Sequence, residues 1–296
     1  IAVYLSAKCP VYFAPAMDLD MYIHPSTLDS FKKLEQFGNT MIPAESGELA
    51  SGLSGEGRMA EPENIVAFIE ADLESRLPLK GQKILITAGP TYEAIDPVRF
   101  IGNHSSGKMG FDIALSAANL GASVILVSGP THCKVSNPLI KVVSVVSAEE
   151  MYIACHQFYA DVDVAIAAAA VADYRPKNVA QQKIKKAADD FVIELEKTKD
   201  ILASLGEQKK NQFLIGFALE TENEIENAKL KIQKKNLDLI VLNSLQDQGA
   251  GFSKPTNKVT FIDKFFNIEP MELKTKEAVA DDILNKVISH FGILQS

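Results

Sequence analysis

From residue 83 onward, short apolar runs that resemble strands alternate with longer runs that have helical spacing. The apolar runs are nearly continuous, which is typical of strands that are buried on both faces of a parallel sheet. The strand candidates are 83–88, 123–128, 140–145, 162–169, 212–218 and 237–242, and the helix candidates are 107–120, 148–159, 199–207, 222–235 and 275–290. This order predicts an α/β fold: a Rossmann-like, mostly parallel sheet with helices on both faces.

Two further segments, 191–196 and 258–273, alternate apolar and polar residues instead. Alternation of this kind indicates strands with one solvated face, as in antiparallel pairs. We therefore expect an antiparallel extension of the sheet, at one of its edges.

Three regions follow one another along the chain. Residues 1–72, one or two strands with a few helices, have little core of their own. Residues 73–82 contain mixed charges, Pro78 and Gly81 and are typical of a linker, and residues 83–296 form the α/β domain. The chain begins at Ile1, directly in strand-like sequence, so we expect it to be a fragment of a longer polypeptide.

The overall composition limits which partners we expect. The formal net charge of -8 argues against a general nucleic-acid binder, although local lysine clusters can still attract a small phosphorylated ligand. The three cysteines, Cys9, Cys133 and Cys155, fit no zinc or disulfide spacing. No apolar run approaches the length of a membrane span. We therefore expect a cytoplasmic protein that does not enter a membrane.

A stretch rich in glycine and hydroxyl residues joins the first strand candidate to the first helix candidate. Residues 88–91 read AGPT and residues 102–110 read GNHSSGKMG. The amino end of a helix presents unpaired N–H groups and a positive dipole end, so it stabilises an anion. The spacing matches neither the dinucleotide fingerprint nor a Walker loop. An ordinary capped loop with turn glycines explains it equally well.

Other polar residues follow the remaining strand candidates, at the edge where open parallel sheets bind ligands. Asp173 ends a run of small uncharged residues and lies close to Arg175, so it is the best acidic candidate. Residues 183–186 read KIKK, and residues 229–235 carry four more lysines on one predicted helix. Two basic groups that converge would suit a triphosphate, whereas lysines that only face solvent are the alternative.

These motifs together resemble phosphopantothenate–cysteine ligase, in that family's order and spacing over residues 83–290. The resemblance is carried by AGPT (88–91), DPVR (96–99), NHSSGKMG (103–110), AVADY (170–174), KIKK (183–186) and GFALET (216–221). It implies that the carboxylate of 4′-phosphopantothenate attacks the α-phosphate of CTP to give an acyl-cytidylate. The amine of L-cysteine then displaces CMP, and Mg²⁺ accompanies the triphosphate.

The resemblance also implies roles for residues of this sequence. Asn103 and Lys183 match catalytic positions, with Asn103 handling the acyl-cytidylate. Lys199 stands where a proline is common in the family. The implied nucleotide-binding positions are Gly89, Ser105, Ser106, Gly107, Asp173, Lys183, Lys199, Asp200, Ile201, Leu202, Phe217, Lys231 and Lys235. The metal ligands are left unassigned, and a homodimer through the ligase domain is expected, with apolar strands near 258–273 as a candidate interface.

The first 70 residues resemble the end of a fused, FMN-dependent phosphopantothenoylcysteine decarboxylase with a flavodoxin-like fold. The positions that would line its substrate and flavin site are Pro15, Met17, Asp18, Ser51, Arg58 and Met59. Asp18 replaces the usual asparagine, and Ser51 replaces the cysteine that reduces the enethiol intermediate. A serine hydroxyl cannot replace a thiol in that step, so either the intermediate is reduced another way or the decarboxylase is impaired. The glycine-rich stretch 46–62 is either a loop that closes over a ligand or a plain surface loop.

We therefore expect that this chain cannot decarboxylate by itself, and that the longer protein forms a higher oligomer. Two other functions compete with the ligase. A nicotinamide-dependent oxidoreductase on a Rossmann-like sheet lacks its glycine fingerprint here, and it also lacks a ribose-binding acid after strand 123–128. A non-catalytic assembly module would form no amide with any nucleotide.

Overall fold

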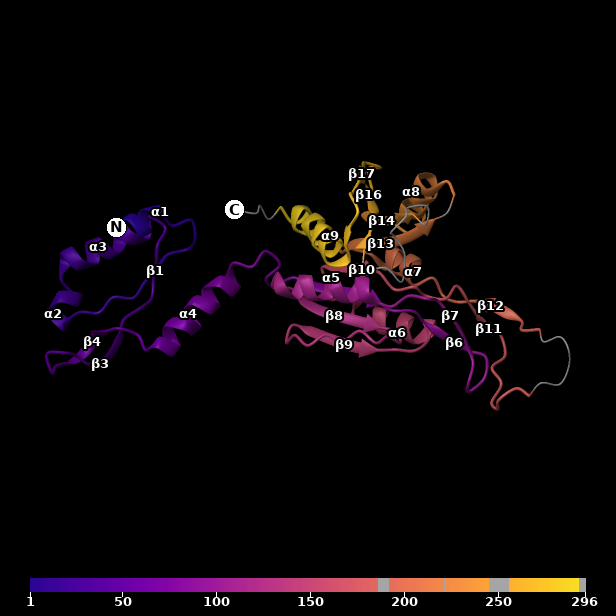
Figure 1. The fold of residues 1–296 in the computed structure, drawn as a ribbon, viewed down its shortest axis with the longest axis horizontal. Coiled ribbons are helices and arrows are strands. Elements are labelled where there is room, and N and C mark those ends of the chain that lie inside the picture. Colours follow the sequence, from indigo (N-terminus) through magenta and orange to yellow (C-terminus); the bar gives the residue numbers. More distant parts are fainter. Residues whose placement is uncertain (186–191, 221, 245–255, 293–296) are drawn as a thin grey trace. The chain divides into compact units, whose positions relative to one another are not determined.

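The chain divides into two compact units, Ile1–Leu77 and Pro78–Ser296, each described here by itself. The structure, a computed structural model, describes residues 1–185, 192–220, 222–244 and 256–292 (Figure 1). The division falls inside the stretch 73–82, in which α4 ends at Ser75 and β5 begins at Lys83. That these units are a decarboxylase remnant and a ligase domain joined by a linker stays a prediction.

The first unit is small and has little core. Its elements are α1 (Ala2–Ser6), β1 (Tyr12–Phe13), α2 (Leu19–Tyr22), α3 (Pro25–Gln36), β2 (Thr40–Met41), β3 (Glu45–Glu48), β4 (Ser54–Arg58) and α4 (Pro62–Ser75). The buried apolar side chains among them are Tyr22, Ile42 and Ala60. β1 pairs in parallel with β2, and β3 pairs antiparallel with β4. The glycine-rich stretch expected as a loop is therefore largely a β-hairpin.

The second unit is built around a sheet of eight strands in the order β17-β16-β14-β13-β10-β5-β8-β9. The six strands from β14 to β9 are parallel, and β16 and β17 add antiparallel at one edge. Their bounds are β5 Lys83–Ala88, β8 Ser123–Ser128, β9 Ile140–Ser144, β10 Val164–Ala167, β13 Phe213–Glu220, β14 Leu239–Ser244, β16 Val259–Asp263 and β17 Ile268–Pro270. The predicted fold class is confirmed.

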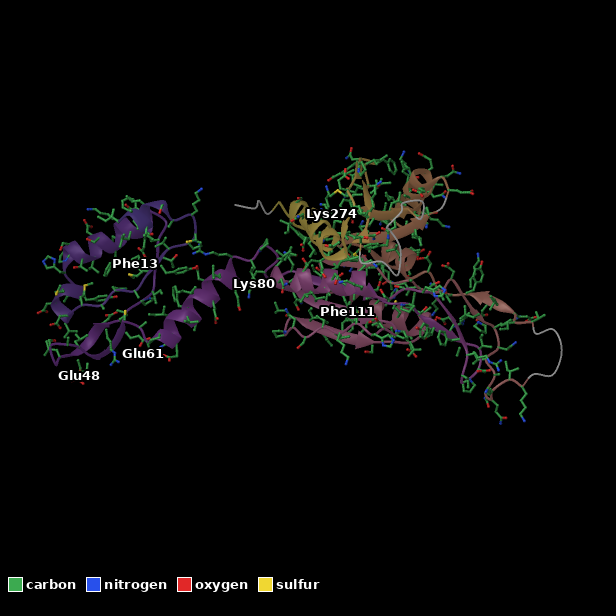
Figure 2. All side chains as sticks on the ribbon, viewed as in Figure 1. Phe13, Glu48, Glu61, Lys80, Phe111 and Lys274 are labelled. Carbon is green, nitrogen blue, oxygen red and sulfur yellow. The ribbon has the colours of Figure 1, made fainter. Side chains whose placement is uncertain are left out.

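Helices cover both faces of this sheet. α5 (Lys108–Asn119) and α9 (Lys276–His290) pack on one face, and α6 (Ala148–Tyr159), α7 (Ile201–Gln208) and α8 (Glu224–Lys234) pack on the other. Neighbouring residues of β5 point in opposite directions: Ile84 and Ile86 pack toward α5 and α9, and Leu85 packs toward the opposite helices. Phe111 of α5 belongs to the first of these cores (Figure 2).

Four short strands form two hairpin-like pairs outside the main sheet. β6 (Tyr92–Ala94) pairs with β7 (Phe100–Gly102), and β11 (Tyr174–Pro176) pairs with β12 (Leu195–Lys197). They lie side by side and extend away from the sheet (Figure 1). β12 therefore corrects the expectation that 191–196 extends the main sheet, whereas 258–273 does so through β16 and β17. A last pair joins β15 (Thr256–Asn257) and β18 (Lys274–Thr275).

A buried carboxylate anchors the amino ends of β13 and β14. Asp238 is 6% exposed, and it accepts hydrogen bonds from the Leu214 amide at 2.9 Å and the Lys209 ammonium at 2.7 Å. Lys264 donates to its other oxygen at 3.1 Å. Burial alone raises the pKa of Asp238, but the Leu214 amide and the two lysines outweigh burial and hold the pKa below its usual range.

We expect Asp238→Asn to lower the free energy of unfolding of this unit by about 1–3 kcal/mol at pH 7, because Lys209 loses its buried counter-charge. Since the folded pKa is depressed, the carboxylate stabilises the protein above its unfolded pKa near 3.9, and this stabilisation is lost as the pH falls through the folded pKa. Hydrogen exchange of the β13 and β14 amides, measured at pH 7 and under acid, checks both effects. Asp161→Asn, in the turn before β10, is the exposed control, and equal protection in the two variants would contradict the prediction.

Candidate functional site

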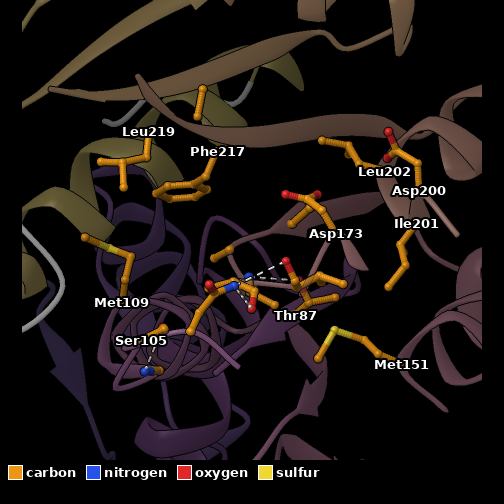
Figure 3. A pocket seen from close by; sticks show the side chains of 18 of the residues that line it. Thr87, Ser105, Met109, Met151, Asp173, Asp200, Ile201, Leu202, Phe217 and Leu219 are labelled. Carbon is orange, nitrogen blue, oxygen red and sulfur yellow. Dashed lines mark hydrogen bonds between the residues drawn. The ribbon is translucent and has the colours of Figure 1, made fainter. Parts of the chain in front are cut away.

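A cavity of about 730 Å³ opens at the carboxyl ends of the parallel strands (Figure 3). Four strands contribute to its floor: Thr87 from β5, the run 167–171 at and after β10, residues 217–219 of β13, and Asn243 of β14. The remaining walls come from the amino end of α5, from the segment 197–202 and from α8 and α9. This is the edge at which open α/β sheets bind ligands.

Close backbone contacts hold the amino end of α5 against the end of β5. Gly107, the residue that precedes α5, has a φ of 80°, and Gly89 after β5 has a φ of 78°, a region that favours glycine. A Cβ on Gly107 would lie 3.2 Å from Gly89 Cα, and a Cβ on Gly129 would lie 1.7 Å from the Pro90 oxygen. The three glycines therefore let three loops meet without side chains between them.

The serines of this stretch hold its loop in shape. The Ser105 hydroxyl accepts from the Gly107 amide at 3.3 Å, and the Ser106 hydroxyl accepts from the Lys108 amide at 3.4 Å. Thr131, in the loop after β8, donates to the Ser106 carbonyl at 2.6 Å. Ser105, Ser106 and Gly107 all line the cavity, whereas Gly89 is not among the lining residues and supports the wall from behind.

The alanine-rich segment after β10 is held by hydrogen bonds from several directions. Asn103, just after β7, donates through Nδ2 to the carbonyls of Ala170 at 3.0 Å and Val171 at 3.3 Å. The Thr91 hydroxyl accepts from the Ala172 amide at 3.0 Å, and the Thr198 hydroxyl donates to the Ala172 carbonyl at 2.6 Å. These bonds fix the backbone that carries Asp173 into the cavity.

Cations outnumber acids around the cavity. Among the described residues that line it, the lysines are Lys108, Lys197, Lys199, Lys231, Lys235 and Lys276, and the acids are Asp173 and Asp200. A concave site with this excess of positive charge attracts anions. The cluster at residues 229–235, predicted from sequence to reach such a site, does so through Lys231 and Lys235.

Four of these lysines are paired with carboxylates. Lys108 contacts Asp112 at 2.9 Å and Glu277 at 3.1 Å. The other pairs are Lys199–Glu149 at 2.7 Å, Lys231–Glu220 at 2.5 Å and Lys235–Asp200 at 2.9 Å. An anionic ligand must therefore compete with side-chain carboxylates for these ammonium groups.

Asp200 has a second task beside its ion pair, because it caps α7 by accepting from the Ala203 amide at 3.0 Å. Burial raises the pKa of Asp200, but this amide and Lys235 together hold it below its usual value. Ile201 and Leu202 follow on α7 and line the same wall, as does Phe217 from β13. The structure thus brings the predicted segment 199–202 and Phe217 to one cavity.

The KIKK segment lies apart from this cavity in the described structure. Lys183 is exposed and is not among the lining residues. The segment is tied to the hairpin of β6 and β7, because the Ile184 amide donates to Asp96 at 3.2 Å and Arg99 donates to the Ile184 carbonyl at 2.9 Å. Lys186, the last lysine of the segment, lies outside the described residues.

The sequence does not single out several polar residues of the wall, among them Asn257 and Lys276. Asn257 is 4% exposed and donates to Asn243 at 3.0 Å, and Lys276 begins α9. Asn243 follows the strand candidate 237–242, where the strand-end rule expects polar groups. Thr275 before Lys276 is a recognisable cap. Nothing local marks Asn257.

In the first unit, the positions expected to line a flavin site come together only in part. The Met17 amide donates to the Gly57 carbonyl at 2.9 Å, so residues 15–18 lie against the hairpin of β3 and β4. The hydroxyl of Ser51 donates to Asp18 at 3.0 Å. Arg58 is paired with Glu61 at 2.5 Å, Pro15 is buried and Met59 is largely exposed.

The described part of the chain offers no ready-made metal centre and no membrane helix. Over residues 1–185, 192–220, 222–244 and 256–292, no group of three or more His, Cys, Asp or Glu side chains could hold a metal ion. None of the helices in those ranges is both long enough and apolar enough to cross a bilayer. Burial raises the pKa of Cys155 to about 12, so this thiol stays protonated.

Comparison with known proteins gives two family matches. Residues 79–291 match the DNA/pantothenate metabolism flavoprotein C-terminal domain, and residues 1–74 match the flavoprotein family. The bifunctional coenzyme A biosynthesis protein CoaBC of Bacillus subtilis (strain 168) is 44% identical, over 96% of this chain and 70% of its own length. A crystal structure of the C-terminal domain of CoaBC aligns with a TM-score of 0.63 at 47% identity, covering 73% of this chain and 98% of that one.

Another relative carries a different name. A protein of an unknown prokaryotic organism, named cysteine/cysteine sulfinic acid decarboxylase, is 52% identical over 97% of this chain and 81% of its own length. The alignment therefore spans both units in each case.

We expect Gly129→Ala to lower the stability of the fold and to distort the wall of the cavity. The added Cβ meets the Pro90 carbonyl rather than a movable side chain, so the backbone must shift, at a cost of about 3 kcal/mol in the free energy of unfolding. Hydrogen exchange of the β5 and β8 amides measures this cost. Gly81→Ala is the control, since its Cβ meets open space and only its positive φ costs about 1 kcal/mol. A smaller effect at Gly129 than at Gly81 would contradict the prediction.

Proposed function

Because the chain belongs to the family of the DNA/pantothenate metabolism flavoprotein C-terminal domain, and to the CoaBC proteins of coenzyme A biosynthesis, we propose that its second unit joins 4′-phosphopantothenate to L-cysteine. One observation carries this proposal: Asn103, Ser105–Gly107, Asp173, Phe217 and the paired lysines line one cavity of about 730 Å³. A cavity of this size accommodates a nucleotide together with an extended acyl substrate.

CTP activates the acyl group in this proposal. A carboxylate oxygen of 4′-phosphopantothenate attacks the α-phosphorus of CTP, a P–O bond forms, and pyrophosphate leaves with the electrons of the bond that breaks. The product is an acyl-cytidylate. The cysteine amine then attacks the acyl carbon, CMP leaves, and the amine loses a proton as the amide forms.

The residues of the cavity favour both steps mainly through charge and position. The ion pairs of Lys231, Lys235 and Lys108 orient these side chains before the ligand arrives, and each can exchange its carboxylate partner for a phosphate oxygen. The backbone N–H groups at the amino end of α5 supply further donors to an anion. Asn103 lines the cavity and bonds to the segment after β10, which supports its proposed role in positioning the acyl group between nucleotide and amine.

Magnesium has no protein cage among the described residues. Asp173 and Asp200 are the acids that line the cavity there, and Asp200 is already held by Lys235 and by the Ala203 amide. Mg²⁺ in this proposal arrives bound to the triphosphate, whose charge it neutralises. No protein ligand is assigned to it.

The proposed role of Lys183 rests on the family resemblance, because Lys183 does not line the cavity in the described structure. Its segment lies outside the cavity wall, where the Ile184 backbone is hydrogen-bonded to the side chains of Asp96 and Arg99. We propose that it reaches the triphosphate only when the segment moves. A homodimer is also part of the proposal, and Phe265 and Ile268 are exposed apolar side chains in the region expected to form its interface.

We expect Asn103→Ala to bind CTP nearly as the parent does and to release pyrophosphate, but to form the amide at least tenfold more slowly. The reason is that the family resemblance assigns Asn103 to the acyl-cytidylate, and its side chain contacts the carbonyls of Ala170 and Val171 rather than a lysine. Mass spectrometry of single-turnover reactions with CTP or ATP measures the acyl-nucleotide and the amide separately. Amide formation at the parental rate, or activation by ATP in place of CTP, would contradict this account.

The first unit has a second candidate function, which the 52% identical relative favours. Its flavoprotein match supports FMN as the cofactor of this unit. The described residues do not by themselves fit a flavin, because Arg58, the cation expected at the site, is engaged by Glu61. Ser51 also offers no thiol to reduce an intermediate, so no decarboxylation step is derived. Asp18, which accepts from Ser51, has the right charge for an ammonium group. The candidate substrate is thus free cysteine or its sulfinic acid.

We expect Asp18→Asn to weaken binding of cysteine and cysteine sulfinic acid at least tenfold, measured by calorimetric titration. The neutral amide attracts an α-ammonium group less strongly. Asp20→Asn, in the first turn of α2, is the control, since Asp18 precedes that helix. Parental binding of both amino acids in Asp18→Asn, or no binding of either by the parent, would reject this candidate and leave the ligase proposal unaffected.

A further inference from the structure

A buried lysine stands at the end of the cavity beside α5. Lys276 is the first residue of α9, and only 6% of it is exposed although it lines the cavity. The Thr275 hydroxyl accepts from the Ala278 amide at 3.2 Å and thereby fixes where the helix begins. Lysine is almost never buried to this extent without compensation, because the ammonium group loses its hydration.

Burial and the neighbouring charges act in opposite directions on Lys276. Burial lowers its pKa, Asp112 and Cys133 act against that effect, and Lys108 adds to it. Oδ1 of Asp112 accepts from Lys108 at 2.9 Å, while Oδ2 is buried and has no hydrogen-bond partner among the described residues. Two lysines, Lys108 and Lys276, therefore lie near Asp112 at this end of the cavity.

Polar groups suited to an anion surround these cations. The amino end of α5, with Ser105 and Ser106, and the buried Asn257 line the same cavity. In Figure 3, Phe217, Leu219, Met109 and Ser105 lie on one side of the pocket, and Asp200 and its neighbours lie on the other.

We propose that Lys276 binds a phosphoryl group of the ligand directly, together with Lys108 and the amino end of α5. The proposal rests on the ligase function and adds to it a residue from the last helix. A phosphoryl group would accept hydrogen bonds from both ammonium groups and from backbone N–H donors at the amino end of α5. Such a group occurs in a nucleoside triphosphate and in the phosphate monoester of the acyl substrate.

A purely structural role for Lys276 predicts something different. If the side chain served only to pack α9 against α5 and to balance Asp112, its loss would lower stability and leave ligand affinity unchanged. Lys276→Met keeps the length of the apolar stem and removes the charge. Lys276→Gln keeps a donor without the charge, and Lys276→Arg keeps the charge.

The test is calorimetric titration of the full chain and of each variant with inorganic pyrophosphate, CTP and 4′-phosphopantothenate. We expect Lys276→Met and Lys276→Gln to weaken binding at least tenfold for the ligand that carries the phosphoryl group, and Lys276→Arg to stay within about threefold of the parent. Loss with pyrophosphate and CTP identifies the triphosphate as the source, and loss with 4′-phosphopantothenate alone identifies the monoester. Lys274→Met is the control, because Lys274 pairs with Asp282 at 2.7 Å and does not line the cavity.

Parental affinity for all three ligands in a folded Lys276→Met or Lys276→Gln protein would overturn the proposal. If neither variant folds, the test rests on Lys276→Arg. A folded Lys276→Arg that binds the ligands as weakly as Lys108→Met does would also overturn the proposal. A parent that binds pyrophosphate but neither CTP nor 4′-phosphopantothenate would contradict the ligase function instead. A parent that binds none of the three would contradict both.

Discussion

The contact among Gly89, Gly107 and Gly129 is the constraint on which the candidate site depends. It brings the loops after β5 and β8 and the start of α5 within backbone contact. Because no side chain stands between them, the first turn of α5 points its N–H groups into the space above the strand ends. The cavity wall, its serines and the position of Lys108 all follow from this close approach.

The same region shows how the chain keeps cations ready for an anion. Lys108, Lys231 and Lys235 are each paired with a carboxylate. The carboxylates belong to Asp112, Glu220 and Asp200, respectively. The pairs keep the ammonium groups oriented and partly desolvated, so that a phosphate that replaces the carboxylate gains a preorganised site. Lys276 differs from them because it is buried, and burial lowers its pKa.

Much of this arrangement could be predicted from the sequence. The continuous apolar runs predict every strand of the parallel core to within a few residues. The rule that ligands bind beyond strand ends leads to the stretch around Asn103 and to Asp173, whereas Phe217 is predicted only through the family resemblance. The hairpin of β3 and β4 was read as a loop, because its glycines hide the alternation of a strand. Asn257 is brought to the site because β15 pairs with β18. This contact joins residues that are distant in the sequence, so no local pattern predicts it.

The central claim is that the cavity activates a carboxylate with CTP. Exchange of radiolabelled pyrophosphate into CTP, measured with 4′-phosphopantothenate and without cysteine, tests it most directly, because exchange requires a reversible acyl-cytidylate. The account predicts exchange that depends on 4′-phosphopantothenate and is lost when Lys235 is replaced by methionine. Exchange that proceeds equally without 4′-phosphopantothenate, or none at all in a parent that binds CTP, would contradict it.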